Sequence, residues 1–456
     1  MSHNPLFHRD PHHSYPVVVR GEGVYLYTDD GHRFIDGTAG AGNVTLGHGR
    51  RRIVEAMADQ SSTLAYCFSA FYTNKPAMEL ATRIAAVAPI DDGRVYLVSG
   101  GSEAIETAFK LARQYHLLRG KGQKQQVISR WRSYHGASLG ALAATGMPQM
   151  RAPFVSWLAD FPHIDPCYPY RCALEGCAGT CNLACARQLE KTILEAGPEN
   201  VSAFVAEPVV MAGVAAGVPP PEYFVQIRAI CDKYDVLFIA DEVITGFGRT
   251  GRYFAIEHWD GVRPDFIVFG KGASSGYMPL GGVVMDGKIA SGFAAAGEFF
   301  QHVFTYVNNP VAARVCLEVM DIIEEEGILA HATETGAYLQ ARARELSAHP
   351  IVGDIRGLGL TLGIELVKDR ETGAPFPAGE KVSQRLCRLA LTRGLSVSGA
   401  SGGADWIDGD DLRFYPPGAH GAAFDRNSFV TMNEVYTNAL CEYLASNCMP
   451  ANLNSQ

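Results

Sequence analysis

The middle of the chain alternates short apolar runs with longer segments that have helical spacing. Each run is rich in β-branched and aromatic residues, as buried strands are. The runs occupy residues 94–98, 126–131, 201–210, 235–243 and 266–270. Strands separated by segments long enough for a helix pair in parallel, and the helices then cover both faces of the sheet. We therefore predict an α/β fold with a mostly parallel central sheet flanked by helices.

The two ends of the chain are expected to form a second, smaller domain. A long helix is predicted to begin at Pro310, a good first-turn residue. After it, residues 351–367 alternate like a strand with one face in water, and the rest is shorter mixed α and β. We expect a large domain at 61–326 and a smaller α+β domain, with its N-terminal part at 1–60 and its C-terminal part at 327–456.

Charge and composition narrow the classes of function. The 456 residues carry a net charge of -9, which argues against nucleic acid as a partner, and no polybasic segment is present for a membrane surface. No apolar stretch of signal-peptide length begins the chain, and no run of about 18 apolar residues occurs in it. We therefore expect a cytoplasmic protein, in which the 11 cysteines are reduced thiols rather than disulfides.

Lys271 follows the apolar run 266–270 and is surrounded by glycines. A lysine at a strand end is most often a solvated surface charge, and this is one of two alternatives for Lys271. Gly270, Gly272 and Gly276 clear space around the amine, however, which suits the close approach of a planar ligand. A desolvated lysine in such a place is a reactive amine.

Another strand end leads into a glycine-rich turn. The run 94–98 is followed by Gly100, Gly101 and Ser102 and then by a segment with helical spacing. The first turn of a helix presents free amides and the positive end of its dipole, and glycines let a phosphate come close. The turn is equally consistent with a plain helix start in which Ser102 is the cap. It lacks the GxGxxG spacing of a dinucleotide site.

Two further strand ends carry polar or aromatic side chains. Asp241 lies at the end of the most apolar run, where a buried carboxylate needs a cation or a hydrogen-bond donor. Arg249 in the following loop is one candidate partner, and a protonated ring nitrogen on a cofactor is another. Tyr134 and His135 follow the run 126–131, where an aromatic ring either stacks on a planar ligand or packs on the core.

Together the four strand ends supply the parts of a pyridoxal phosphate (PLP) site. Open parallel sheets bind ligands at the carboxyl ends of their strands, where all four features fall. The turn at Gly101 and Ser102 would hold the phosphate, and Tyr134 would stack on the ring. Lys271 would bind the aldehyde as a Schiff base, and Asp241 would keep the pyridine nitrogen protonated so that the ring absorbs negative charge.

Six segments carry these and neighbouring residues: SGGSEAIETAFKLAR, SYHGAS, AEPVV, ADEVITGFGRTG, GKGASSGYMPLGG and FTYVNNP. In this order they resemble the sequence blocks of the class III PLP-dependent aminotransferases of fold type I, often called ω-transaminases. The resemblance runs from GVYLYTDDG near the start to LRFYPP near the end, so it covers nearly the whole chain. It implies the fold of that family, a large cofactor domain plus a small domain built from both chain ends.

The resemblance also implies a role for each matching residue. Lys271 would be the Schiff-base lysine, and Asp241 would bond the pyridine nitrogen. Gly101, Ser102, Tyr134 and His135 would also contact the cofactor, and Val243 would pack on the second face of the ring. Glu207 would support Asp241 or Tyr134. Thr305 would contact the cofactor of a neighbouring subunit. A homodimer or dimer of dimers with shared active sites follows, with ping-pong transfer of an amino group from an amino acid or amine to a keto acid.

One departure from the family pattern bears on the substrate. Many relatives that use 2-oxoglutarate carry EPxQGEAG, whereas this chain has EPVVMAGVAAG and lacks the glutamate that gates an arginine. Arg413 matches the family's carboxylate-binding arginine and would be free for a substrate; the alternative is a structural arginine bonded to a nearby loop. We expect pyruvate or a similar keto acid as acceptor and an ω- or β-amino acid or simple amine as donor. An amino-acid racemase or epimerase, a decarboxylase and a non-catalytic ligand sensor remain alternatives.

The other departure is an insertion at about residues 163–186 that holds Cys167, Cys172, Cys177, Cys181 and Cys185. No two of them have the C-x-x-C spacing that is typical of zinc and iron–sulfur sites. We therefore expect reduced thiols in a surface insertion near the mouth of the site, with no bound metal. We refer to this segment as the cysteine insertion.

Overall fold

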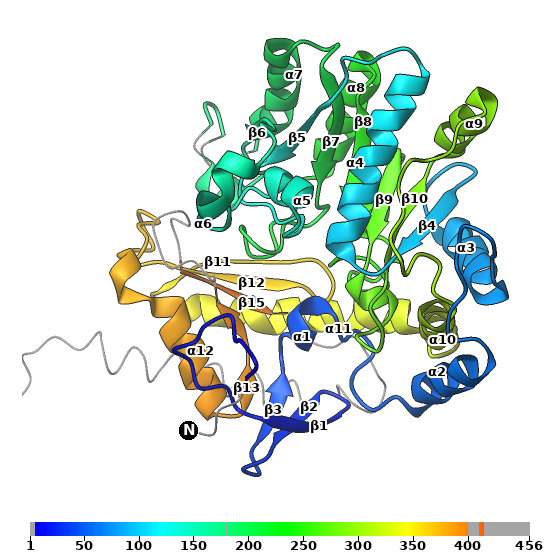
Figure 1. Ribbon diagram of the computed structural model, residues 1–456. Helices are drawn as coiled ribbons and strands as arrows, with labels where there is room; N and C mark the ends of the chain where they lie inside the picture. Colours follow the sequence, from blue (N-terminus) through cyan, green and yellow to red (C-terminus); the bar gives the residue numbers. More distant parts are fainter. Residues whose placement is uncertain (1–4, 173, 178–180, 400–409, 415–456) are drawn as a thin grey trace, which may run out of the picture.

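The core of the protein is a central sheet of seven described strands, in the order β4-β10-β9-β8-β7-β5-β6 (Figure 1). The computed structural model describes residues 5–172, 174–177, 181–399 and 410–414. The strands of this sheet are β4 (Arg94–Val98), β10 (Gly281–Met285), β9 (Phe266–Phe269), β8 (Leu237–Asp241), β7 (Val201–Ala206), β5 (Gln126–Arg130) and β6 (His163–Ile164). Neighbouring strands from β9 to β6 pair in parallel, and β10 is antiparallel to both of its neighbours.

Helices cover both faces of this sheet, as predicted. Phe266 and Val268 of β9 belong to the core under α4 and α9, whereas Ile267 and Phe269 belong to the core under α7, α8 and α10. These helices are α4 (Gly101–Leu118), α9 (Gly287–Ala296), α7 (Ala184–Ala196), α8 (Glu222–Tyr234) and α10 (Pro310–Glu325). Strands β7 to β10 are buried at every residue, which explains why β7, β8 and β9 are continuous apolar runs.

β10 has no counterpart among the predicted strands. It lies between β4 and β9, and its sequence GGVVM offers few of the residues that favour strands. A glycine is needed there, because a Cβ on Gly282 would lie 2.4 Å from the ring of Phe269. The predicted runs 201–210 and 235–243 end earlier than expected, as β7 at Ala206 and β8 at Asp241, because the residues that follow turn toward a pocket.

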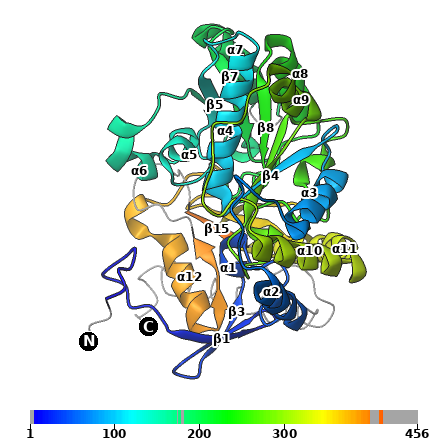
Figure 2. The same cartoon turned by 45° about the vertical axis from the view of Figure 1, so that its right-hand side comes forward.

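The two ends of the described chain meet in the smaller part of the protein. Leu395 of β13 pairs in parallel with Ile35 of β3, so a C-terminal strand completes an N-terminal sheet. That sheet consists of β1 (Val18–Glu22), β2 (Tyr25–Thr28), β3 (Arg33–Asp36) and β13 (Leu395–Ser396). The predicted fold class, an α/β fold with a smaller α+β part from both chain ends, is confirmed (Figure 2). The domain boundaries expected at residues 60 and 326 stay predictions.

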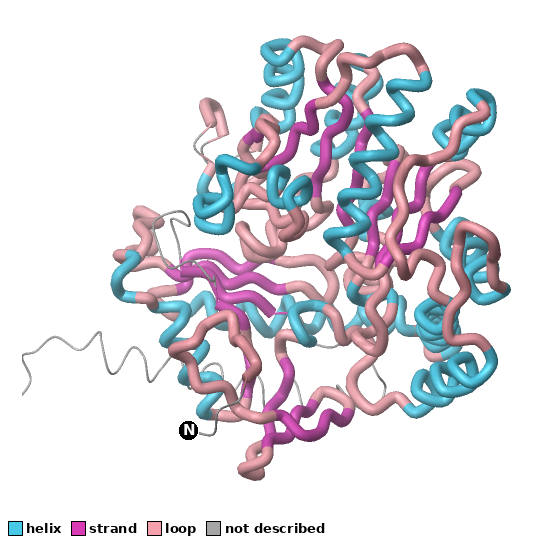
Figure 3. The backbone as a smooth tube through the Cα atoms, viewed as in Figure 1, coloured by secondary structure: helices cyan, strands magenta, loops and turns pink. Residues whose placement is uncertain are grey.

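A second sheet of the smaller part corrects one expectation. Residues 351–367 form two antiparallel strands rather than one, because the chain turns at Gly357 (φ 159°) and Gly359 (φ 57°). β12 is buried at every residue and has no face in water. The sheet consists of β11 (Val352–Arg356), β12 (Leu362–Leu366), β15 (Asp410–Phe414) and β14 (Ser398–Gly399), and it packs against α12 (Val382–Thr392) (Figure 3).

The long helix expected at Pro310 is α10, whose cap Asn309 accepts a hydrogen bond from the Ala312 amide at 2.9 Å. The remaining helices are α1 (Ala39–Gly42), α2 (Arg51–Thr63), α3 (Lys75–Val87), α5 (Leu139–Ala144), α6 (Pro148–Arg151) and α11 (Ile328–Ala343). Among the described residues, no helix combines the length and the apolar character that crossing a membrane requires.

Candidate active site

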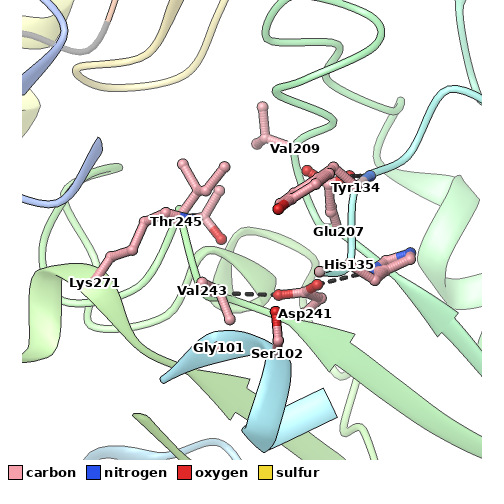
Figure 4. A pocket seen from close by; sticks show the side chains of 12 residues that line it. Gly101, Ser102, Tyr134, His135, Glu207, Val209, Asp241, Val243, Thr245 and Lys271 are labelled. Atoms are coloured by element: carbon pink, nitrogen blue, oxygen red, sulfur yellow. Dashed lines mark hydrogen bonds and ion pairs between the residues drawn. The ribbon is translucent and has the colours of Figure 1, made fainter. Parts of the chain in front are cut away.

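One pocket lies where β5, β7, β8 and β9 end and α4 begins (Figure 4). Eight residues expected at the cofactor site line it: Gly101, Ser102, Tyr134, His135, Glu207, Asp241, Val243 and Lys271. Gly136, Val209, Ile244 and Thr245 also line it, and the sequence had not singled them out. Each lies one or two positions from an expected residue, so the strand-end argument needed only to be extended along the loops.

Asp241 is the last residue of β8 and is only 4% exposed. Its Oδ2 lies 2.7 Å from Nδ1 of His135, and its Oδ1 accepts the Val243 amide at 3.1 Å. An ionised carboxylate can only accept hydrogen bonds, so Nδ1 of His135 carries the proton. Two hydrogen-bond donors therefore satisfy a buried carboxylate that faces the pocket. Arg249, the other candidate partner, donates from Nη2 to the Gly42 carbonyl at 3.1 Å.

Lys271 follows β9 at the start of a 3₁₀ turn, with a positive φ of 39°. Its side chain lines the pocket together with Asp241. Desolvation by the surrounding protein lowers the pKa of the Lys271 amine, while the carboxylates of Asp241 and Glu207 act in the opposite direction. The lysine is therefore the desolvated amine of the two alternatives, which favours its neutral, nucleophilic form.

The amino end of α4 forms the floor of the site. Gly100 is the N-cap and has no side-chain cap, and Ser102 lies inside the first turn, so the alternative in which Ser102 caps the helix is wrong. A Cβ on Gly101 would lie 2.8 Å from Cγ1 of Val243, so only glycine fits between the turn and that side chain. α4 has 18 residues. The amides in the first turn of a helix have no partner within the helix, so the closely packed start of α4 suits an anion such as a phosphate.

Glu207 supports the loop that carries the aromatic residue. Its Oε1 accepts the Tyr134 amide at 2.9 Å, and its Oε2 accepts the Met211 amide at 3.2 Å. Burial raises the pKa of Glu207, and it also raises the pKa of the Tyr134 phenol. Of the two contacts expected for Glu207, the structure has the one to Tyr134. The neutral ring of Tyr134 and the side chain of Val243 both border the pocket, as a planar ligand requires.

Two expected residues remain, Thr305 and Arg413. Thr305 is exposed, and its carbonyl accepts a hydrogen bond from the Tyr66 hydroxyl at 2.7 Å. The backbone of Arg413 lies in β15, opposite Gly363 of β12 and Ser398 of β14. The side chain of Arg413 lies outside the part of the structure that is described. The roles of both residues stay predictions.

Comparison with known proteins places these features in context. The family model Aminotransferase class-III matches residues 7–416. The putrescine–pyruvate aminotransferase of Pseudomonas aeruginosa is 41% identical over 379 residues, or 82% of this chain and 81% of that protein. The diaminobutyrate–2-oxoglutarate transaminase of Halomonas elongata is 37% identical over 410 residues, 88% and 86% of the two chains. The solved structure of a Pseudomonas jessenii ω-transaminase in complex with PMP has a TM-score of 0.87, 33% identity, and coverage of 96% and 97%.

Proposed function

The chain belongs to the class III aminotransferases and is a PLP-dependent transaminase of fold type I, and we propose that it moves the amino group of an ω- or β-amino acid, or of a simple amine, to pyruvate or a keto acid of similar size. Membership of this family decides in favour of amino transfer over the racemase, decarboxylase and ligand-sensor alternatives. The transfer proceeds in two half-reactions, in which the donor leaves as an aldehyde or ketone before the keto acid is aminated.

The proposal rests on one observation. Lys271 lines the same pocket as the buried carboxylate of Asp241, which accepts two hydrogen bonds. PLP supplies an aldehyde that takes the amino group and a ring that takes up negative charge. Asp241, which accepts hydrogen bonds from His135 and the Val243 amide, would hold a proton on the ring nitrogen. Lys271, whose pKa is lowered by desolvation, would bind the aldehyde and, once released, would take the proton from the substrate Cα and deliver it to C4′ of the cofactor.

The remaining residues position the cofactor. The amides of the first turn of α4, with Gly101 and Ser102, would bind the phosphate. Tyr134 would stack on one face of the ring and Val243 would pack on the other. Glu207 fixes the Tyr134 loop through two backbone amides, so it acts as a positioning residue rather than by touching the ring.

We also propose that the active unit is a homodimer or a dimer of dimers in the cytoplasm, with Thr305 contacting the phosphate in the neighbouring subunit. Large apolar side chains gather in the segments on either side of Thr305 and in the loop before α3, where Phe71 is 77% and Phe299 is 75% exposed. Tyr306 from the first group packs edge-on against Tyr66 from the second. Exposed aromatic residues of this kind favour burial against a second copy of the chain.

The choice of acceptor rests on the segment after Glu207 and on Arg413. Val209, Val210 and Met211 are buried and apolar, so this stretch offers no carboxylate to neutralise a substrate-binding arginine. One arginine clamps one carboxylate bidentately, which suits pyruvate better than the two carboxylates of 2-oxoglutarate. The two curated relatives differ at this point, since one is a pyruvate and the other a 2-oxoglutarate enzyme by name.

A screen of amino donors against pyruvate, 2-oxoglutarate and glyoxylate tests this assignment. Arg413→Ala should raise KM for carboxylated partners by about tenfold or more and leave kcat nearly unchanged, because a charge-assisted contact made throughout the reaction acts mainly on binding. Arg413→Lys keeps the charge but loses the bidentate geometry and should fall in between. A wild type that accepts 2-oxoglutarate alone, or an Arg413→Ala variant with unaltered keto-acid kinetics, contradicts the proposed substrate and leaves the family assignment standing.

A further inference from the structure

Three thiols of the cysteine insertion converge in the folded chain. The Sγ atoms of Cys167, Cys181 and Cys185 all lie within 4.8 Å of one another. Cys167 follows β6, and Cys185 lies in the first turn of α7, where both are buried; Cys181 is half-buried. The spacing along the chain did not reveal this group, because its members come from two segments joined by a loop.

The charge next to these thiols is unusual. Arg130, the last residue of β5, is fully buried, and its Nη2 donates to the Glu207 carbonyl at 2.5 Å. Its Nε and Nη1 are buried without a hydrogen-bond partner among the described residues. The Glu207 carboxylate is turned toward the amides of Tyr134 and Met211. A buried guanidinium with two unpaired nitrogens calls for negative charge beside it.

The thiols are the groups that can supply this charge. Arg130 interacts electrostatically with both Cys167 and Cys185. The buried hydroxyl of Tyr223 also interacts with Arg130 and these two thiols. The polar atoms around the cluster are therefore arranged for an anionic group that neutral thiols do not provide.

We propose that Cys167, Cys181 and Cys185 bind one zinc ion as thiolates. With water as the fourth ligand, three thiolates and one Zn²⁺ carry a net charge of minus one, which the guanidinium of Arg130 balances. Sulfur atoms around a tetrahedral zinc lie about 3.8 Å apart for a Zn–S bond of about 2.3 Å, so small side-chain movements suffice. A disulfide would use only two of the three thiols. This proposal replaces the expectation of an insertion without metal.

Binding is not a redox step, and each thiol that ligates the ion gives up its proton. The other two thiols of the insertion lie outside the converging set, and Sγ of Cys177 donates to Oδ1 of Asn182 at 2.9 Å. Zinc in structural sites normally has four ligands. The fourth position goes to Cys172, to Cys177 or to water, and a count of sulfur neighbours distinguishes these arrangements.

The ion would have a structural role behind the cofactor pocket. Arg130 joins the cluster to the Glu207 carbonyl, and Glu207 holds the amide of Tyr134. On its other side the insertion contacts the smaller part, because Arg171 forms an ion pair with the fully buried Glu365 of β12. Zinc would thus fix the insertion against both parts of the chain.

Elemental analysis of the purified holoenzyme, made in zinc-containing medium and kept reduced, tests the proposal. We expect about one zinc per chain in the wild type and in Cys316→Ser, a matched variant whose buried thiol lies in α10. Zinc should fall at least tenfold in Cys185→Ser. If that variant does not fold, Cys181→Ser, at a half-buried position, takes its place.

X-ray absorption at the zinc edge gives a second measurement. Three or four sulfur neighbours at about 2.3 Å are expected. Four results would overturn the proposal: no stoichiometric metal, an undiminished zinc content in both Cys185→Ser and Cys181→Ser, iron with acid-labile sulfide in place of zinc, or a protein mass two hydrogens short because a disulfide joins two of the thiols. None of these results bears on the transaminase assignment.

Discussion

The hydrogen bond between His135 and Asp241 offers the sharpest test of the proposed cofactor chemistry. His135→Leu removes the donor from Oδ2 of Asp241 and leaves the Val243 amide on Oδ1. Loss of the second ring nitrogen should break no further hydrogen bond, since Nε2 is buried without a hydrogen-bond partner among the described residues. The substitution therefore isolates one charge-assisted bond.

The size of the effect follows from the ionised partner. A buried hydrogen bond to a charged group contributes about 1.5–3 kcal/mol, and each 1.36 kcal/mol in a barrier changes a rate about tenfold. If the ring nitrogen loses its proton to the same extent as Asp241 loses stabilisation, turnover should fall by about tenfold to about 150-fold. Cofactor binding should persist, because the lysine and the phosphate turn are untouched.

The assay is a single-turnover half-reaction with a saturating amine donor, followed by the absorbance of the bound cofactor in a stopped-flow instrument. His135→Asn is the matched control, because its amide nitrogen can donate where Nδ1 does, and its rate should stay within about fivefold of the wild type. A His135→Leu rate within twofold of the wild type, or an equal loss in both variants, would refute the role assigned to this bond.

Three further predictions address other parts of the protein. Lys271→Ala should fold, since alanine tolerates the positive φ about as well as lysine does, but should lose at least about 10²–10⁴-fold in turnover, and borohydride should attach the cofactor covalently to the wild type only. Burial raises the pKa of Glu242 from 4.5 to about 7. Its proton therefore stabilises the fold fully below about pH 4.5, and this contribution is lost as the pH rises through about 7. In urea unfolding, the free energy of unfolding of Glu242→Gln should exceed that of the wild type by up to about 3 kcal/mol at pH 9 and by little at pH 4.5. Sedimentation of the holoenzyme should show a dimer or tetramer that releases cofactor on dilution to monomer, and a fully active monomer would contradict the shared site.

Much of the site could be predicted because the carboxyl ends of buried strands can be recognised in the sequence. Asp241 and Lys271 each follow an apolar run, and parallel strands bring such positions to one edge of the sheet. The glycine-rich turn at Gly101 could be predicted in the same way, because it follows the apolar run 94–98. The contact that orients Asp241 could not be read, since His135 comes from a different strand, and which nitrogen meets which oxygen depends on the fold.

Features that depend on long-range packing escaped the sequence. β10 is too rich in glycine to look like a strand, and its place between β4 and β9 reflects the close approach of Gly282 to Phe269. Arg130 lies within the predicted run 126–131, and nothing in the sequence singles it out. Only the folded chain shows that it is buried beside the thiols of Cys167 and Cys185.

The buried carboxylate of Glu365 makes β12 a mechanical link between distant segments. It pairs with Arg171 of the cysteine insertion and, at 2.8 Å, with Arg356 of β11. Two residues earlier on the same strand, Gly363 lies opposite Arg413. Given the role proposed for Arg413, a movement of β12 that displaces Arg413 is expected to strain or break the pair between Arg171 and Glu365. We therefore expect a substitution of Arg171 in the insertion to act on the strand that pairs with the backbone of Arg413.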